Sequence, residues 1–315
     1  DADPSERNIF GVMRQDPQLA KNGIRLRQIG QRIIEILGGK KIHPTWVVPG
    51  GVSEALSAEK RDAMLAMLPE GLQIAKDTYA FFKTLIPRFL DEANHFGTAE
   101  TLFLSLVTPE GNLEHYDGVL RITDAQGRIL EDGVPPGEYP RLIAEAVEDF
   151  SYMKFPYYKP MGYPQGVYRV GPLARLNNAE ACGTPYADVA LAEFRMLQDD
   201  SGPVRSSFHY HYARLVEILY GLERIERLLK DPDILDHRVR SRARSNRNEG
   251  IGVSEAPRGT LMHHYQIDDA GLITWVDLII ATGHNNLAMN QSIRQVADAY
   301  VDGNALNEGM LNRVE

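Results

Sequence analysis

"SSFHYHYARLVEILYGLERIERLLKD", residues 206–231, carries the strongest helical pattern in the chain. Its apolar residues recur three or four positions apart, and Pro232 lies just beyond its end. The stripe consists of Leu215, Val216, Leu219, Leu222, Ile225 and Leu229. Such a stripe is typical of a helix that packs one side into a core, so the segment predicts a helical body.

Three further segments have the same helical period. Residues 19–39 end at a Gly-Gly pair, and residues 290–301 form a short amphipathic stretch. Residues 57–93 begin at Ser57, a good N-cap, and we expect breaks or kinks near Pro69 and Pro87.

Other parts of the chain favour strands. Residues 116–133 contain two short β-like runs joined at 124–127, which indicates a hairpin. A second hairpin is predicted where residues 260–267 and 272–281 flank the turn 269–271. Residues 155–177 are dense in Tyr, Pro and Gly, and we interpret them as a long, fixed loop. The fold class is therefore α+β, a mainly helical bundle with small antiparallel sheets.

The composition excludes several classes of function. The chain has 315 residues and a formal net charge of -9, which argues against a nucleic-acid surface. No apolar run approaches the roughly 20 residues of a membrane span. Cys182 is the one cysteine, so internal disulfides and CxxC sites are absent, and a cytoplasmic location fits. There is no repeat or long linker, so we treat residues 1–315 as one body.

One arginine stands out in "EGIGVSEAPRGTLMHHY", residues 249–265, which we read as a loop leading into the second hairpin. Arg258 follows a proline and precedes a glycine, and its nearest acidic neighbour in the chain is Glu255. Either this loop lies in water, or Arg258 points at a negative group that the chain does not supply. The Pro-Arg-Gly triplet alone favours a structural ion pair.

The remaining candidates favour structural roles. His263 and His264 are adjacent, so a strand would point them to opposite faces, and His209 and His211 lie at a helix start. The arginine-rich run 238–247 reads as a solvated or subunit-facing surface. No GxGxxG, P-loop, HExxH or GxSxG motif occurs.

Several motifs together resemble one family. "HPTWVVPGGV", "YRVGPLARLN", "HYARLVEIL", "EAPRGTL" and the terminal "LNRVE" occur in the order found in large subunits of nickel–iron hydrogenases. "GIRLRQIGQ" and "SEAPRGTLMHHY" look closest to the cytoplasmic, bidirectional, NAD-linked type. The resemblance covers essentially all 315 residues. It implies a long helical bundle flanked by small sheets.

The resemblance also implies an active site: a nickel–iron pair with carbon monoxide and two cyanides on the iron. It places the Arg258 guanidinium over the open coordination position and near a cyanide. Pro257 and Leu261 would form the apolar wall around the diatomic ligands, and Thr282 would donate a hydrogen bond to the other cyanide. His43 and Glu255 would support this site from behind.

The implied reaction is heterolytic cleavage of dihydrogen, with the proton passing to a cysteine thiolate or to the guanidinium. The implied partners are an iron–sulfur small subunit and flavin-containing diaphorase subunits that reduce NAD.

The chain departs from the family at its metal ligands. The family holds its metals with two CxxC pairs, and neither pair occurs here; Cys182 matches no ligand position. We expect the chain to be the central part of a hydrogenase large subunit, which alone binds no nickel and consumes no hydrogen. The alternatives are a metal-free scaffold or assembly homologue of the same fold, and a split protein completed by other chains.

Overall fold

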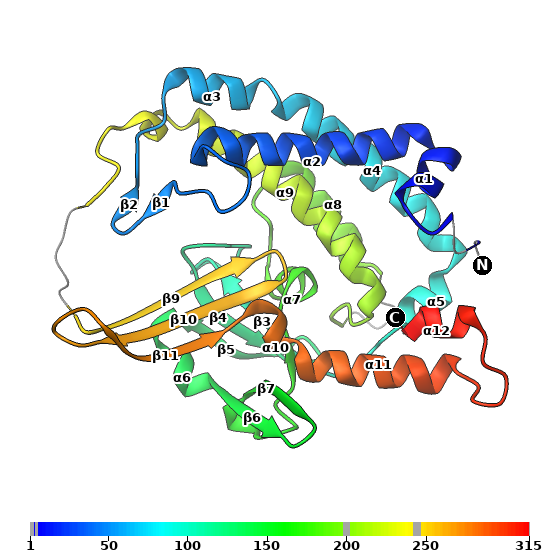
Figure 1. Cartoon of the computed structure of the whole chain (residues 1–315). Coiled ribbons are helices and arrows are strands. Elements are labelled where there is room, and N and C mark those ends of the chain that lie inside the picture. The colour runs from blue at the N-terminus through cyan, green and yellow to red at the C-terminus, as the bar shows by residue number, and fades with distance from the viewer. Residues whose placement is uncertain (1–2, 4–5, 198–201, 242–246, 315) are drawn as a thin grey trace. The chain divides into compact units, whose positions relative to one another are not determined.

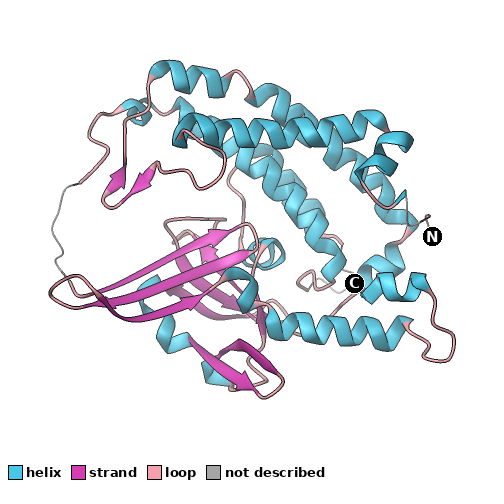
Figure 2. Ribbon diagram, in the orientation of Figure 1, coloured by secondary structure: helices cyan, strands magenta, loops and turns pink. Residues whose placement is uncertain are grey.

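The computed structural model describes residue 3 and residues 6–197, 202–241 and 247–314. The chain forms two compact units: residues 1–85 with 217–246, and residues 86–216 with 247–315. The helix α9 (Tyr210–Lys230) begins in the second unit and ends in the first (Figure 1). Most of the strands belong to the second unit (Figure 2).

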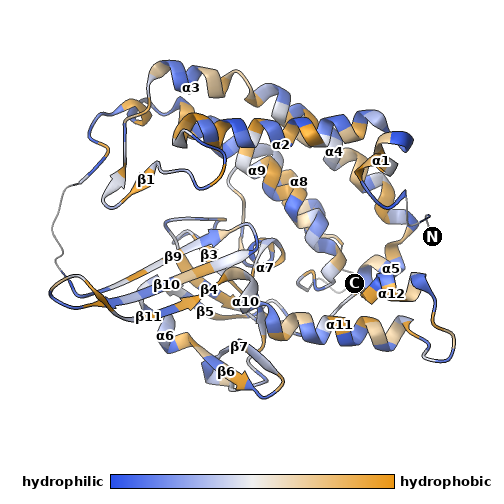
Figure 3. Ribbon diagram, viewed as in Figure 1, coloured by the Kyte–Doolittle hydropathy of each residue, from blue (hydrophilic) through white to orange (hydrophobic). Residues whose placement is uncertain are grey.

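The first unit is helical apart from one small hairpin. Its elements are α1 (Ile9–Gln15), α2 (Pro17–Gly38), β1 (Val47–Val48), β2 (Gly51–Val52), α3 (Ala58–Leu65), α4 (Leu68–Leu85) and the later part of α9. Asp16 caps α2 by accepting from the Leu19 amide at 2.9 Å, and Gly39 ends it in a left-handed conformation. Hydrophobic and hydrophilic residues alternate along α2 (Figure 3), and Ile29 and Ile33 are buried.

A glycine lets three helices of this unit pack closely. A Cβ on Gly71 of α4 would lie 3.3 Å from Leu222 of α9 and 3.5 Å from Ile29 of α2. Helices α2 and α4 are also joined at the surface by Arg25 and Glu70, whose nearest atoms are 2.6 Å apart. The apolar contacts hold the pair, because exposed ion pairs contribute only about 0–1 kcal/mol.

The second unit is built on a mixed sheet of order β5–β4–β3–β8. Its strands are β3 (Leu102–Val107), β4 (Val119–Thr123), β5 (Ile129–Val134) and β8 (Tyr168–Arg169), and β8 runs parallel to β3. A second sheet has the order β11–β10–β9, and its strands are β9 (Glu249–Ala256), β10 (Gly259–Ile267) and β11 (Ile273–Ile279). The strands β6 (Ile143–Glu148) and β7 (Ser151–Tyr158) form a separate hairpin.

Short helices complete this unit. They are α5 (Leu90–His95), α6 (Tyr139–Leu142), α7 (Pro172–Asn178), α8 (Pro185–Arg195), α10 (Ala281–His284), α11 (Asn286–Tyr300) and α12 (Glu308–Val314). Helix α7 packs on β3, and α10 packs on β10. Helix α7 therefore lies against the four-stranded sheet, and α10 lies against the three-stranded sheet.

The core of the second unit lies around β3, all six residues of which are buried. One cluster of buried side chains joins both sheets through Leu106, Leu120, Val170, Met262 and Ile279. The β9–β10 hairpin is therefore anchored in the same core as the larger sheet.

Most sequence expectations are confirmed. The helices at 19–38 and 210–230, the break before Pro69, the end near Pro87 and the Ser57 cap are all present. Both predicted hairpins form, as β4–β5 and β10–β11. The α+β class with small sheets around a mainly helical body is correct.

Two loop predictions are wrong. Residues 155–177 contain the end of β7, the strand β8 and helix α7. The Pro and Gly residues of this segment favoured a loop, although β7 pairs with β6 and Pro156 lies opposite Glu145. Residues 249–256 form the strand β9. Gly250 and Gly252 had favoured a loop, because glycine weakens the interior of a strand.

Part of the arginine-rich run 238–247 can be described. Arg238 pairs with Asp236 at 2.9 Å, and Arg240 donates to the Pro49 carbonyl at 3.2 Å. Residues 242–246 lie outside the described part of the chain. Within the described residues, no helix is both long enough and apolar enough to cross a bilayer.

Because β3 lies in the core, shortening one of its side chains should destabilise the chain more than shortening an exposed side chain. Leu106→Ala removes a side chain with 0% exposure and should cost about 2–5 kcal/mol of unfolding free energy. Leu272→Ala is the matched control, because Leu272 is 67% exposed and its loss should cost less than about 0.5 kcal/mol. Urea unfolding of both variants measures the difference, and equal losses would contradict the placement of β3.

Candidate functional site

Arg258 lies at the tip of the β9–β10 hairpin. Ala256 pairs with Gly259, so Pro257 and Arg258 are the two residues of the turn. The Arg258 side chain is exposed and forms no hydrogen bond or ion pair with any residue that the structure describes. A structural ion pair for Arg258, which the short motif alone favoured, is therefore not found among the described residues.

Glu255 has a different partner. Its Oε2 lies 2.7 Å from Nη1 of Arg175 on α7, and both side chains are at most 1% exposed. The other carboxylate oxygen, Oε1, accepts from the Leu106 amide at 2.9 Å and from the Thr260 hydroxyl at 2.8 Å. The buried carboxylate is thus fully paired, as a charge in a protein interior must be.

The same arginine also binds the backbone of the turn. Arg175 donates from Nη1 to the Ala256 carbonyl at 3.0 Å and from Nη2 to the Pro257 carbonyl at 3.5 Å. Arg214 of α9 donates to the Pro257 carbonyl as well, at 3.3 Å. Two guanidinium groups therefore hold the carbonyls of the turn from the protein side.

The back of the turn fits against the residues that precede α7. A Cβ on Gly259, which has φ of 137°, would lie 2.2 Å from a methyl carbon of Val170. A Cβ on Gly171, which has φ of 99°, would lie 2.8 Å from the Arg258 carbonyl oxygen. The two glycines let the backbones touch, so the Pro-Arg-Gly and Val-Gly-Pro motifs form one contact.

Val170 is itself held on both sides. Its amide donates to Oδ1 of Asn285 at 2.9 Å, and its carbonyl accepts from the Tyr210 hydroxyl at 3.2 Å. These bonds join the segment 168–171 to the residue that follows α10 and to the start of α9.

A buried Tyr–His pair supports the same region. The Tyr168 hydroxyl lies 2.5 Å from Nδ1 of His284, and Nε2 of His284 lies 3.2 Å from the Ile279 carbonyl. The carbonyl only accepts, so Nε2 carries the proton and Nδ1 accepts from the tyrosine. Burial lowers the pKa of His284 to about 3, which keeps the ring neutral at physiological pH.

The other predicted site residues take the following places. Leu261 lies on β10, partly buried, two residues past the turn, and Thr282 is exposed in α10. His43 is exposed with φ of 51° and belongs to the first unit. The structure therefore brings Glu255, Pro257, Arg258 and Leu261 together in one hairpin of the second unit.

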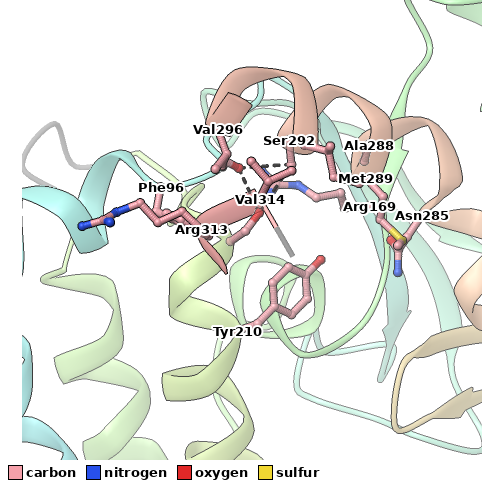
Figure 4. A pocket seen from close by; sticks show the side chains of 13 residues that line it. Phe96, Arg169, Tyr210, Asn285, Ala288, Met289, Ser292, Val296, Arg313 and Val314 are labelled. Carbon is pink, nitrogen blue, oxygen red and sulfur yellow. Dashed lines mark hydrogen bonds between the residues drawn. The ribbon is translucent and has the colours of Figure 1, made fainter. Parts of the chain in front are cut away.

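A cavity of about 370 Å³ adjoins this region (Figure 4). Ala288, Met289 and Val296 of α11 give it a largely apolar wall, while Tyr210 and Asn285 reach it from the side of Val170. The two side chains that fix Val170 therefore border open space.

A further arginine, which is buried, lines the cavity. Arg169 donates to the Thr101 hydroxyl at 2.7 Å and to the Arg205 carbonyl at 2.8 Å, and it faces the ring of Phe103. Burial lowers the pKa of Arg169.

No group of three or more His, Cys, Asp or Glu side chains that could hold a metal ion occurs among the described residues. Cys182 is buried, and its amide donates to Asp188 at 2.7 Å. As predicted, His263 and His264 point to opposite faces of β10: His263 meets Tyr265, and His264 meets Tyr139 and Glu249.

The other two histidines lie where α9 begins, His209 immediately before it and His211 in its first turn. His209 is fully buried beside Asn94, with 2.9 Å between Nε2 and Oδ1. Burial lowers its pKa to about 4.

Sequence reasoning missed the residues that hold the hairpin: Tyr168, Gly171, Arg175 and Asn285. One signal was available for Gly171, because Gly-Pro before a helix marks a tight entry. Arg175 gave no such signal, since an arginine on a short helix looks the same in sequence whether it is solvated or buried.

The chain is similar to known hydrogenases along nearly its whole length, although no family model matches it. It is 40% identical over 304 residues to a subunit of the F420-non-reducing hydrogenase vhu of Methanococcus voltae, covering 96% of this chain and 71% of that one. It is 37% identical over 325 residues to the beta subunit of the NAD-reducing hydrogenase HoxS of Cupriavidus necator, covering all of this chain and 66% of that one. The chain thus spans about two thirds of the length of these curated relatives.

A solved structure agrees. The NAD+-reducing [NiFe]-hydrogenase in the H2-reduced state superposes with a TM-score of 0.94 at 43% identity, covering 99% of this chain and 69% of that one. Fold and sequence together define a hydrogenase subunit. The chain belongs to the nickel–iron hydrogenase large-subunit family.

The interlocked glycines predict a position-specific cost. Gly259→Ala should cost about 3 kcal/mol of unfolding free energy, because it combines backbone strain with a clash against Val170. Gly271→Ala is the matched control: it has φ of 82° but no atom within 4 Å of the new Cβ, so about 1 kcal/mol is expected. Similar losses in urea unfolding would show that the contact with Val170 does not stabilise the chain.

The buried histidine predicts an acid-dependent loss of stability. His284 binds fewer protons folded than unfolded, so its contribution is present above its unfolded pKa of about 6.5 and is lost as pH falls toward 3. His284→Gln, which keeps one donor and one acceptor, should reduce the slope of unfolding free energy below pH 6.5 by about 1.4 kcal/mol per pH unit. His95→Gln, at a side chain that is 73% exposed, is the control and should leave the slope unchanged. An unaltered slope in His284→Gln would refute the assignment.

Proposed function

We propose that this chain is the H2-activating large subunit of a nickel–iron hydrogenase, which splits dihydrogen heterolytically. The observation that carries the proposal is Arg258: an exposed guanidinium without a partner among the described residues, on a turn anchored by a buried ion pair. The 0.94 TM-score to the NAD+-reducing [NiFe]-hydrogenase supports the same activity.

The residues around Arg258 fit the outer ligands of a nickel–iron centre. A cyanide on iron is an anionic acceptor, and a hydrogen bond from a guanidinium to such a group contributes about 1.5–3 kcal/mol. Pro257 beside Arg258 offers an apolar surface without a backbone donor, and Leu261 extends it along β10. In this proposal the Thr282 hydroxyl would donate a hydrogen bond to the second cyanide.

The described residues do not supply the metal ligands themselves. They contain no cluster of metal-binding side chains, and the single cysteine lies buried in the segment before α8. The centre, when bound, supplies the redox chemistry of hydrogen cleavage. The role of this chain's residues is to orient the outer ligands and to exclude water, with Glu255 and His43 as supports.

For the electron acceptor we propose NAD, reached through an iron–sulfur small subunit and flavin-containing diaphorase subunits in the cytoplasm. The NAD-reducing relative from Cupriavidus necator and the solved NAD+-reducing enzyme support this choice. The relative from Methanococcus voltae, at similar identity, is named as F420-non-reducing, so its name excludes one acceptor and gives none. In this proposal the acceptor is set by the partner subunits rather than by the residues of this chain.

Arg258→Lys in the assembled, nickel-containing enzyme tests the proposal. Lysine keeps the charge but loses the planar fork, so kcat for hydrogen uptake should fall by about 100-fold, as on loss of one preorganised donor. Nickel content, measured by elemental analysis, should stay unchanged because Arg258 holds no metal. Arg238→Lys, at an exposed arginine paired with Asp236, is the control and should keep full activity. Full turnover in Arg258→Lys would instead remove Arg258 from the mechanism.

A further inference from the structure

We infer that Arg175 is the positioning residue for Arg258, acting through the backbone of the turn and not through the reacting groups. The inference rests on the proposed function, because it assigns the direction of the Arg258 guanidinium to a second, buried guanidinium.

The first argument is that the two terminal nitrogens of Arg175 bind different groups. One nitrogen, Nη1, binds both the Glu255 carboxylate and the Ala256 carbonyl, while Nη2 binds the Pro257 carbonyl. A single rigid, planar group therefore spans three consecutive residues immediately before Arg258. Lysine cannot reproduce this, because its ammonium is a single point of charge without a fork.

The second argument is the direction of the peptide groups. In a trans peptide the carbonyl and the following N–H point in opposite directions. Arg175 and Arg214 hold the Pro257 carbonyl toward α7 and α9, so the Arg258 amide must face away from both helices. The proline has a fixed φ, which removes one of the remaining rotations of the turn. The bonds from Arg175 thus select the orientation from which the Arg258 side chain starts.

The third argument is that α7 carries Arg175, while the residue directly before this helix, Gly171, contacts the turn from behind. Gly171, whose backbone touches the Arg258 carbonyl, lies four positions, about one helical turn, before Arg175. The Arg175 amide donates to the Gly171 carbonyl at 2.9 Å. The hairpin tip is therefore held at two points by the same rigid element.

Arg121 provides a matched comparison. It is also a buried arginine of this unit that bonds to carboxylates and a carbonyl, namely Asp132, Glu180 and Asn178. None of these partners belongs to the β9–β10 hairpin. A residue whose role is only to stabilise the unit should resemble Arg121 in its effects.

A double-mutant cycle on the assembled enzyme tests the inference, with Arg175→Lys, Arg258→Lys and the double variant. Arg175→Lys alone should lower kcat by at least about 10-fold, with KM for hydrogen and nickel content unchanged. If Arg175 acts through Arg258, the double variant should be no slower than Arg258→Lys within about two-fold. Arg121→Lys should lower thermal stability while keeping kcat within about two-fold of wild type.

Multiplicative losses in the double variant, or full activity in Arg175→Lys, would overturn the inference. Failure of the proposed function is a separate outcome, because it appears as full activity in Arg258→Lys. Arg214→Gln covers the case in which Arg175→Lys does not mature. Arg214 is exposed and contributes one bond to the Pro257 carbonyl, so its loss should lower kcat by about two- to three-fold, and only when Arg258 is present.

Hydrogen exchange gives a readout that needs no metal. In Arg175→Lys the amides of residues 255–261 should exchange at least about 10-fold faster, while those of β4 keep their wild-type rates. Uniform acceleration across the second unit would indicate general destabilisation and would contradict a positioning role.

Discussion

The ion pair between Arg175 and Glu255 is the constraint on which the candidate site depends. A buried pair is not needed for stability, since well-packed apolar residues often serve as well, whereas removing one partner costs about 3–5 kcal/mol. What an apolar pair could not do is donate to the Ala256 and Pro257 carbonyls. The interaction therefore links the core of the second unit to the geometry of an exposed turn.

Much of the fold follows from the sequence, because long helices repeat their apolar residues regularly. The helix at 210–230 and the hairpin at 119–134 appear where their periodicity predicts them. The failures have a common physical cause. β7 and β9 are stabilised by pairing with other strands, and the Pro and Gly residues within them lower their strand propensity. Pairing with other strands, rather than local propensity, determines the structure of these segments.

The candidate site also contains features that the sequence predicts and features that it does not. Pro257 and Gly259 mark a turn in the sequence, so the place of Arg258 outside regular structure could be predicted from its two neighbours. The partner of Glu255 could not, because 80 residues separate it from Arg175 and only the packing of α7 on β3 brings them together. The resemblance to nickel–iron hydrogenases, which the known relatives establish, assigned chemistry to residues whose roles no local pattern reveals. The described residues contain no cluster of side chains that could hold the metals.

The contact between Gly259 and Val170 also has an evolutionary consequence. The space between the two backbones admits one methyl-bearing side chain, and that of Val170 already fills it. A Cβ at position 259 would also lie 2.7 Å from the backbone nitrogen of Gly171, so a smaller residue at position 170 would not make room for it. Position 259 should therefore stay glycine across related chains, whatever residue occupies position 170.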